Sequence, residues 1–119
     1  MEALESLEAG DVVWVEFDPA IGHEQTGRRP ALVVSSSEYN KRSSLLVVCP
    51  ITRNTQPWPF KVLIPEDAGI SGAILVDQVK SIDRKRRVVR RAKRIPKSTL
   101  LDVRAKLAAL MGITSANTF

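Results

Sequence analysis

The feature that most constrains this chain is a series of short apolar runs, rich in valine, isoleucine and leucine, that are separated by glycine, proline and polar residues. The runs cover residues 12–18, 31–35, 45–51, 60–64 and 73–76, and a further short run that includes two arginines covers residues 88–92. Runs of this length between turn-forming residues are typical of β-strands. A total of six or seven short strands predicts a mainly β fold, either a small barrel or a strongly bent sheet. The 119 residues are enough for one domain, residues 1–119, and leave no room for a second.

The first run alternates in a way that assigns its two faces. One face carries Val13, Val15 and Phe17, and the other carries Val12, Trp14, Glu16 and Asp18. Because successive side chains of a strand point to opposite sides, the wholly apolar face is expected to meet the core. Phe17, at the end of the run, is placed to reach the mouth of the loop that follows. Residues 1–9 lack a strand pattern and are expected to form a loose arm.

One helix is expected near the C-terminus. It follows Pro96 and stops at Gly112, and Ser98 or Thr99 is available as a cap. Its leucine and valine residues recur at helical spacing, at Leu100, Val103, Leu107 and Leu110. This stripe favours a helix that packs on one end of the sheet. The alternative is a zipper that binds a partner.

The single cysteine, Cys49, lies inside an apolar run, where a buried and inert thiol is expected. The acidic N-terminus does not have the pattern of a secretory signal, and no stretch approaches the length of a membrane span. No membrane association and a reducing cytoplasm are therefore expected.

The positive charge is concentrated in residues 80–94. This segment has nine basic residues against one acid, Asp83, a local charge of +8 that leaves −3 on the rest of the chain. Such a segment indicates attraction to a polyanion, which can be a nucleic acid or an acidic protein segment. The alternative is a charged edge strand around residues 88–92 that is kept soluble and unpaired by its like charges.

Residues 22–30, Gly22-His23-Glu24-Gln25-Thr26-Gly27-Arg28-Arg29-Pro30, hold the only histidine together with an acid and two arginines. Glycine and proline shape such loops, and a loop dense in titratable groups is suited to positioning a ligand. One histidine and one buried cysteine do not make a usual zinc site, so no metal is expected. The glycine fingerprints of nucleotide-binding loops are absent from the sequence, and no cofactor is expected.

The remaining side chains suit a phosphodiester. Arg29 can grip a phosphate through two parallel hydrogen bonds, and a threonine hydroxyl can donate a third. In RNA the 2′-hydroxyl is an internal nucleophile, so a base such as Glu24 need only remove its proton. Pro30 disfavours the helical region for Arg29, which is therefore expected to be extended.

Several motifs together resemble the MazF/PemK (Kid) family of toxins. They are Gly10-Asp11 followed by Trp14, Phe17-Asp18-Pro19, the loop from Gly22 to Pro30, Pro50-x-Thr52, Pro59-Phe60, and Asp77-Gln78-Val79-Lys80-Ser81-Ile82. The similarity covers residues 10–113. It implies an SH3-like, CcdB-like barrel that acts as a homodimer and cuts single-stranded mRNA at selected sequences without a metal, leaving 2′,3′-cyclic phosphate and 5′-hydroxyl ends. It also implies a MazE-like acidic antitoxin, and contact with DNA only through the toxin–antitoxin complex.

The resemblance also implies roles for single residues. Arg29 matches the catalytic arginine of the family, Thr52 matches its catalytic threonine, and Glu24 matches the acid proposed as general base. The Kid branch has an arginine two residues before its Asp-Gln, where this chain has Leu75. Arg29 is therefore expected to stabilise the anion alone. His23 matches a histidine of the Kid branch and is either a substrate contact or a solvated loop residue.

Further RNA contacts are expected from the second polar loop and from the motif at residue 77. The candidates are Phe17, Arg53, Trp58, Asp77, Gln78 and Lys80. Trp58, between two prolines, either stacks on an unpaired base or plugs the end of the barrel. Two other functions stay open: a toxin of the same fold that inhibits a protein such as DNA gyrase, and a nucleic-acid-binding module without chemistry.

Overall fold

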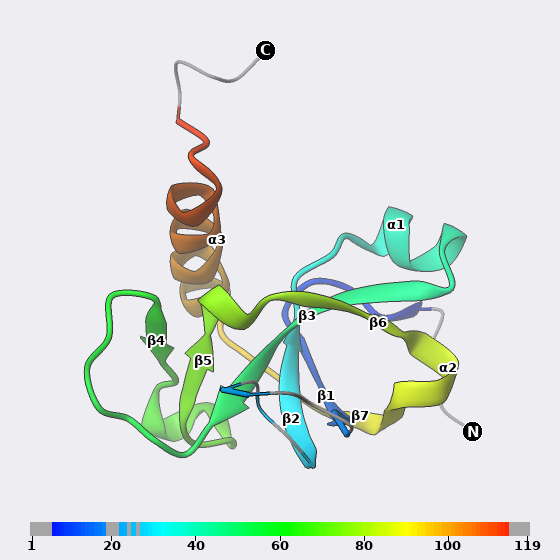
Figure 1. Cartoon of the computed structure of the whole chain (residues 1–119), viewed down its shortest axis with the longest axis horizontal. Coiled ribbons are helices and arrows are strands. Elements are labelled where there is room, and N and C mark those ends of the chain that lie inside the picture. Colours follow the sequence, from blue (N-terminus) through cyan, green and yellow to red (C-terminus); the bar gives the residue numbers. More distant parts are fainter. Residues whose placement is uncertain (1–5, 19–21, 24, 26, 115–119) are drawn as a thin grey trace.

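The computed structural model describes residues 6–18, 22, 23, 25 and 27–114. Seven strands form most of the fold, and a long helix follows them (Figure 1). The strands are β1 (Asp11–Glu16), β2 (Arg28–Val33), β3 (Leu45–Thr52), β4 (Lys61–Leu63), β5 (Ala73–Leu75), β6 (Lys80–Asp83) and β7 (Val88–Arg94). The helices are α1 (Ser37–Arg42), α2 (Arg84–Arg87) and α3 (Lys97–Met111), with 3₁₀ turns η2 (Glu66–Ala68) and η3 (Val76–Gln78). The mainly β fold class with a C-terminal helix is confirmed.

All strand pairs are antiparallel, in the order β4-β5-β3-β2-β1-β7, and β6 pairs with β3 off this path. Strand β3 changes its neighbour along its length. Its first half pairs with β6 as far as Val48, and its end pairs with β5 from Ile51. Pro50 lies between the two pairings. Proline has no backbone N–H, and at this position no hydrogen bond between strands is lost. The sheet bends at this point.

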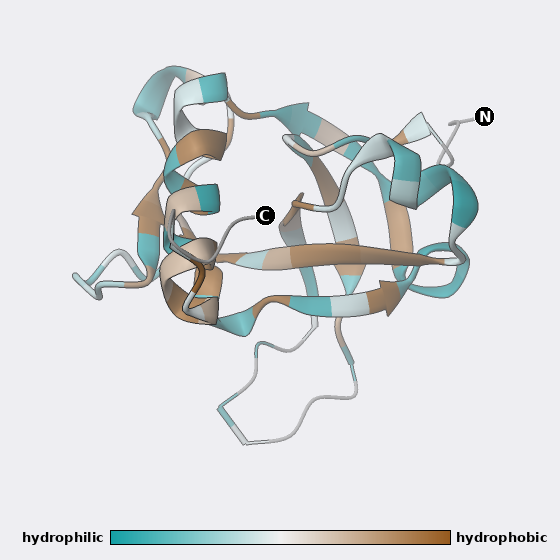
Figure 2. Ribbon diagram, turned by 90° about the horizontal axis from the view of Figure 1, so that it is seen from above, coloured by the Kyte–Doolittle hydropathy of each residue, from teal (hydrophilic) through white to brown (hydrophobic). Residues whose placement is uncertain are grey.

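The bend produces two cores, one on each side of the central strands. One cluster joins β1, β2, β3, β4, β5 and α3, and the other joins β1, β2, β3, β6 and β7. Figure 2 shows the apolar ribbon of the central strands between α3 and the rest of the barrel. Val13, Val15 and Phe17 share the second cluster as expected. Val12 was expected to face away from the core; it is fully buried in the first cluster, because the bent sheet covers both faces of β1 there.

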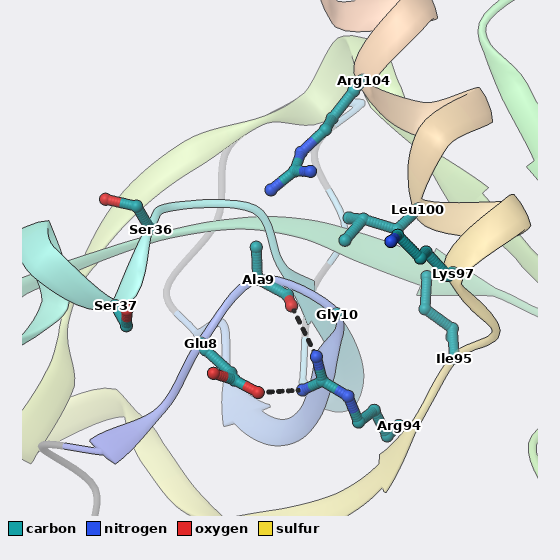
Figure 3. Close-up of a pocket in the computed structure, with 10 residues that line it drawn as sticks. All are labelled: Glu8, Ala9, Gly10, Ser36, Ser37, Arg94, Ile95, Lys97, Leu100 and Arg104. Atoms are coloured by element: carbon teal, nitrogen blue, oxygen red, sulfur yellow. Dashed lines mark hydrogen bonds and ion pairs between the residues drawn. The ribbon is translucent and has the colours of Figure 1, made fainter.

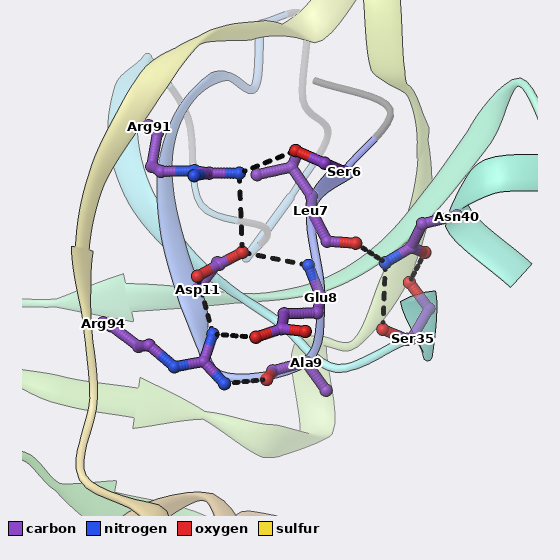
Figure 4. A network of polar contacts seen from close by, with 9 residues as sticks. All are labelled: Ser6, Leu7, Glu8, Ala9, Asp11, Ser35, Asn40, Arg91 and Arg94. Atoms are coloured by element: carbon purple, nitrogen blue, oxygen red, sulfur yellow. Dashed lines mark hydrogen bonds and ion pairs between the residues drawn. The ribbon is translucent and has the colours of Figure 1, made fainter. Parts of the chain in front are cut away.

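The expectation of a loose arm over residues 1–9 is wrong for residues 6–9. Leu7 is completely buried, and its carbonyl accepts a hydrogen bond from Asn40 Nδ2 at 2.9 Å. Arg94 binds Glu8 and the Ala9 carbonyl (Figure 3), and the wider network of Figure 4 includes Asp11 and Arg91. The two leucines of this acidic segment, Leu4 and Leu7, form no strand alternation, so only tertiary packing reveals the role of Leu7. Residues 1–5 lie outside the described residues.

Helix α3 begins after Pro96 and ends at Gly112, which adopts the left-handed conformation at φ 72°. The expected caps Ser98 and Thr99 lie inside the helix instead. Leu100 and Val103 are buried, so the interpretation of the stripe as core is correct for the first turns. A second apolar stripe, Leu101, Ala105, Ala108 and Met111, is largely exposed.

Two elements went unpredicted. Strand β6 has one buried apolar residue, Ile82, among polar ones, and α2 is made of four basic residues. Arg84 at the start of α2 is buried and donates to the carbonyls of Asn40 and Ser43. Asp83 caps α2 by accepting from the Arg86 N–H at 2.9 Å. Within the described residues, no helix is long and apolar enough to cross a membrane.

Candidate functional site

The candidate active site is a cleft between β2 and β3. These strands pair at Ala31–Pro50 and then part, since β2 continues along β1 while β3 continues along β5. The gap is a cleft of about 670 Å³. Its walls include Arg28, Arg29 and Pro30 from β2, and Ile51, Thr52 and Arg53 from the end of β3. Trp14, Gly27 and residues 69–71 complete the lining.

Arg29 and Thr52 lie on opposite sides of this cleft. Continuing the register of Ala31 with Pro50 by two residues places Arg29 across from Thr52. Arg29 is held extended in β2 by its pairing with Val15, as expected from Pro30. Thr52 is 7% exposed, and its Oγ1 accepts the Asn54 N–H at 3.1 Å. Since the hydroxyl is an acceptor in this bond, its hydrogen is available to donate to a ligand.

The backbone of Thr52 is fixed by a close approach of Gly72. Thr52 pairs with Ala73 in β5, and Gly72 just before it has φ 125°. A Cβ at position 72 would lie 2.3 Å from the Thr52 carbonyl oxygen. Only glycine fits both this conformation and this distance. Gly72 was missed from the sequence, although a glycine directly before an apolar run is a known sign of close backbone approach.

The loop after β1 is tied down at its base. Gly27 N–H donates to Asp18 Oδ1 at 2.8 Å, and Phe17 N–H donates to the Gly27 carbonyl at 2.9 Å. Arg87 donates to the carbonyls of Glu16 and Asp18. These contacts set the direction in which the loop leaves the barrel and place Arg28 and Arg29 at the cleft. His23 is exposed, while Glu24 lies outside the described residues.

A smaller pocket of about 210 Å³ lies beside the same loop and brings together several predicted RNA contacts. Phe17, Asp77, Gln78 and Lys80 line it. Gln78 Oε1 accepts the Gln25 N–H at 3.0 Å, which links η3 to the loop. The Lys80 ammonium lies 5.9 Å from the centre of the Phe17 ring. Phe17 is only 2% exposed, so it forms a wall of the pocket and has little surface on which a base could stack.

Trp58 lies in the loop after β3 and does not plug the barrel. Its side chain is half exposed, at 51%, and its Nε1 donates to Asp77 Oδ2 at 3.0 Å. Lys61 orders this loop by donating from Nζ to the carbonyls of Asn54 and Gln56, at 2.9 and 3.0 Å. Lys61 was not predicted as a site residue, because nothing in the sequence distinguishes it from other lysines near a loop.

The basic segment 80–94 is divided between structural and free cations. Arg84 and Arg87 bind backbone carbonyls, Arg91 and Arg94 pair with Asp11, and the Arg90 guanidinium lies 5.5 Å from the Trp14 ring centre. These five arginines, two in α2 and three in β7, contact other parts of the fold. Their charge still adds to the positive potential of this face.

Cys49 is buried and chemically quiet. Burial, followed by the nearby negative charge of Asp77, raises the pKa of its thiol to about 12. The thiol is therefore neutral at physiological pH, which confirms the expectation of an inert cysteine. Among the described residues, no group of three His, Cys, Asp or Glu side chains is arranged to hold a metal ion.

The bent seven-stranded sheet, the C-terminal helix and the arginine–threonine cleft define a small β-barrel protein whose candidate site is a cleft lined by arginines. Residues 8–111 match the family described as PemK-like, MazF-like toxins of type II toxin–antitoxin systems. The chain belongs to this family.

Three relatives illustrate the similarity. The endoribonuclease toxin MazF of Escherichia coli K12 is 36% identical over 103 residues, 87% of this chain and 92% of the relative. A crystal structure of MazF from Deinococcus radiodurans is 40% identical, with a TM-score of 0.83, over 91% of this chain and 98% of that one. A crystal structure of MazE-MazF from the same organism has 35% identity and a TM-score of 0.76, over 92% and 98%. The gyrase-inhibitor alternative is not favoured by these relatives.

Proposed function

We propose that the chain is an endoribonuclease toxin that cleaves single-stranded RNA in the cleft between β2 and β3. The observation that carries the proposal is the placement of Arg29 and Thr52 on facing walls of one cleft, in a chain whose relatives are named endoribonucleases. Among the described residues, three arginines line the cleft and no acid does, which suits a polyanionic substrate.

The reaction proceeds by attack of the 2′-hydroxyl oxygen on the adjacent phosphorus. A base takes the 2′-proton, the new O–P bond forms, and the bond to the 5′-oxygen breaks as that oxygen takes a proton from solvent water. The products are a 2′,3′-cyclic phosphate and a 5′-hydroxyl. Because the nucleophile belongs to the substrate, this step needs no metal ion to generate one. Glu24 is the proposed base.

Arg29 stabilises the charge that develops on the phosphorane oxygens, and Thr52 donates a further hydrogen bond from its hydroxyl. A guanidinium with a pKa of about 12.5 or above is a poor proton donor near neutral pH, so charge stabilisation is its role. The Gly72 contact and the Asn54 hydrogen bond keep Thr52 in position.

RNA on either side of the scissile phosphate is held by two neighbouring regions. The exposed ring of Trp58 stacks on an unpaired base, while Arg53 from the same loop binds phosphate. Gln78 and Lys80 at the smaller pocket read a second nucleotide, and His23 on the exposed loop contacts the substrate. Asp77 contributes by fixing the Trp58 indole.

Two further properties complete the proposal. A cognate acidic antitoxin neutralises the toxin, in line with the family description, and the complex acts in the cytoplasm.

The toxin is a homodimer, because the apolar stripe of Leu101, Ala105, Ala108 and Met111 on α3 is largely uncovered in one copy. Replacing Leu101 and Met111 with glutamate is expected to give a monomer in light scattering, whereas glutamate at the exposed Lys41 leaves the dimer intact. A wild-type monomer at micromolar concentration would contradict the dimer.

The experiment that tests the activity is incubation of the purified chain with a single-stranded RNA in excess EDTA. Cleavage is expected to persist, with 5′-hydroxyl ends and with 3′ ends that resist phosphatase until the cyclic phosphate is opened by acid. The Arg29→Ala variant serves as the matched control for a contaminating nuclease. Intact RNA after prolonged incubation with wild-type protein would overturn the proposal.

A further inference from the structure

A second cavity, of about 560 Å³, lies away from the catalytic cleft and shares none of its lining residues. It is enclosed by the start of α3, the chain just before β1, and the start of α1 (Figure 3). The floor is aliphatic, formed by Ala9, Ile95 and Leu100. The cavity belongs to the part of the barrel that the proposed reaction does not use.

The charges around this cavity are mostly positive. Arg94, Lys97 and Arg104 line it, against the single acid Glu8. Arg94 is engaged with Glu8 at 3.1 Å and with Asp11 at 2.8 Å, so its charge is balanced. Lys97 and Arg104 are exposed, and within the described part of the chain neither has an ion pair. They leave a net positive site.

The two unpaired cations are presented together by α3. Lys97, Leu100 and Arg104 follow one another at helical spacing and lie on one face of the helix. In Figure 3 the guanidinium of Arg104 points from the helix into the cavity. The N-terminus of α3 adds its own partial positive charge, since the N-cap Pro96 has no side-chain group to accept bonds from the first-turn amides.

The opposite wall supplies hydroxyl groups. Ser36 and Ser37 line the cavity, and Ser36 Oγ accepts the Tyr39 N–H at 3.3 Å, which leaves its own hydrogen free to donate. Cations and hydroxyl donors above an aliphatic floor suit a ligand that has an anionic group next to an apolar one. None of the described residues that line the cavity is aromatic, so they offer a nucleobase no ring on which to stack.

We propose that this cavity anchors a carboxylate-bearing peptide segment, an aspartate or glutamate flanked by an aliphatic residue, of the antitoxin. The inference rests on the proposed function, because it identifies where that partner docks. The anchor shares no lining residue with the cleft that holds Arg29 and Thr52.

The test uses a fluorescein-labelled peptide of alternating glutamate and leucine, titrated with the full chain and followed by fluorescence anisotropy at low salt. The double variant Lys97→Gln/Arg104→Gln is expected to bind the peptide about 3- to 30-fold more weakly, as for the loss of two exposed ion pairs. The control Lys41→Gln/Lys85→Gln removes the same charge from exposed sites outside the cavity. It is expected to stay within about 2-fold of wild type, because distant exposed charges are screened.

Two results would overturn the inference. Equal losses in both double variants would mean that the peptide senses only the overall charge. If a non-cleavable deoxy-substituted RNA lost affinity for Lys97→Gln/Arg104→Gln and the peptide did not, the cavity would be a nucleic-acid subsite. RNA cleavage by Lys97→Gln/Arg104→Gln separates this inference from the proposed function. The variant is expected to cleave RNA at the wild-type rate, so a change in peptide binding reports on the cavity and not on the catalytic cleft.

Discussion

Gly72 supports Thr52 through a contact that a single methyl group would break. An alanine at this position would place its Cβ 2.3 Å from the Thr52 carbonyl oxygen and would have to adopt φ 125°. The neighbouring atom is backbone, held by the pairing of Thr52 with Ala73, so it has no side-chain rotation with which to move away. The substitution therefore forces β3 and β5 apart at Thr52, the proposed catalytic threonine.

The cost has two parts. A non-glycine residue in a sparsely populated backbone region costs about 1–3 kcal/mol, and the forced shift of packed backbone costs about 1–3 kcal/mol more. For a domain of this size, the sum corresponds to a fall in melting temperature on the order of 10–20 °C. A displacement of Thr52 by about 1 Å is expected to slow RNA cleavage about 10²-fold in the fraction that remains folded.

The assay pairs thermal unfolding, followed by circular dichroism, with cleavage of a short RNA at a temperature where the variant is folded. Gly112→Ala is the matched control, since Gly112 also has a positive φ, 72°, but nothing lies within 4 Å of an added Cβ. This control is expected to lose about 1 kcal/mol and to cleave RNA at the wild-type rate. If Gly72→Ala has the same melting temperature as Gly112→Ala and cleaves RNA at the wild-type rate, the assigned role of the Gly72 contact is wrong.

Three other predictions address single side chains. Arg29→Ala should slow cleavage by about 10²–10³-fold with an unchanged circular dichroism spectrum; wild-type cleavage by the folded variant would remove Arg29 from the mechanism. Trp58→Ala should weaken RNA binding by about 1–3 kcal/mol with little change in the rate at saturating RNA, and Trp58→Phe should retain part of the affinity; equal affinities in all three proteins would contradict stacking. The Cys49 thiol, with its pKa raised to about 12, should not react with a disulfide reagent at pH 8 until urea unfolds the chain. Because the unfolded thiol ionises at lower pH than the folded one, this group makes the fold less stable as the pH rises above 9. Rapid reaction of the native protein would show that the thiol is accessible.

Local sequence patterns predicted most of the secondary structure. The apolar runs became β1 to β5 and β7, with boundaries shifted by a few residues, and the leucine spacing predicted α3. Strand β6 was not predicted, because one buried residue among polar ones gives no strand pattern. Leu7 was assigned to a loose arm for a similar reason: residues 1–9 show no strand alternation, yet the barrel buries Leu7 completely.

The candidate site, like the fold, was predicted in part from the sequence and in part only from the tertiary structure. Sequence motifs identified Arg29 and Thr52 as candidates. A match to a family motif can be made without knowing the positions of the residues in the folded protein. The sequence also left open whether Trp58 is exposed and how the cations of residues 80–94 are used. Exposure and ion pairing depend on which elements lie nearby, and those neighbours come from distant parts of the chain.

By itself, the sequence determined the class of fold, the elements that form it and the chemical groups available for a reaction on RNA. These properties depend on residue type and on spacing along the chain. Only the tertiary structure decided that β2 and β3 part after Ala31 and Pro50, and so opened a cleft between Arg29 and Thr52. It also decided that Gly72 supports Thr52 and that Lys97 and Arg104 face a second cavity. The physical reason is that strand pairing and packing join residues far apart in sequence, and no local pattern encodes those contacts.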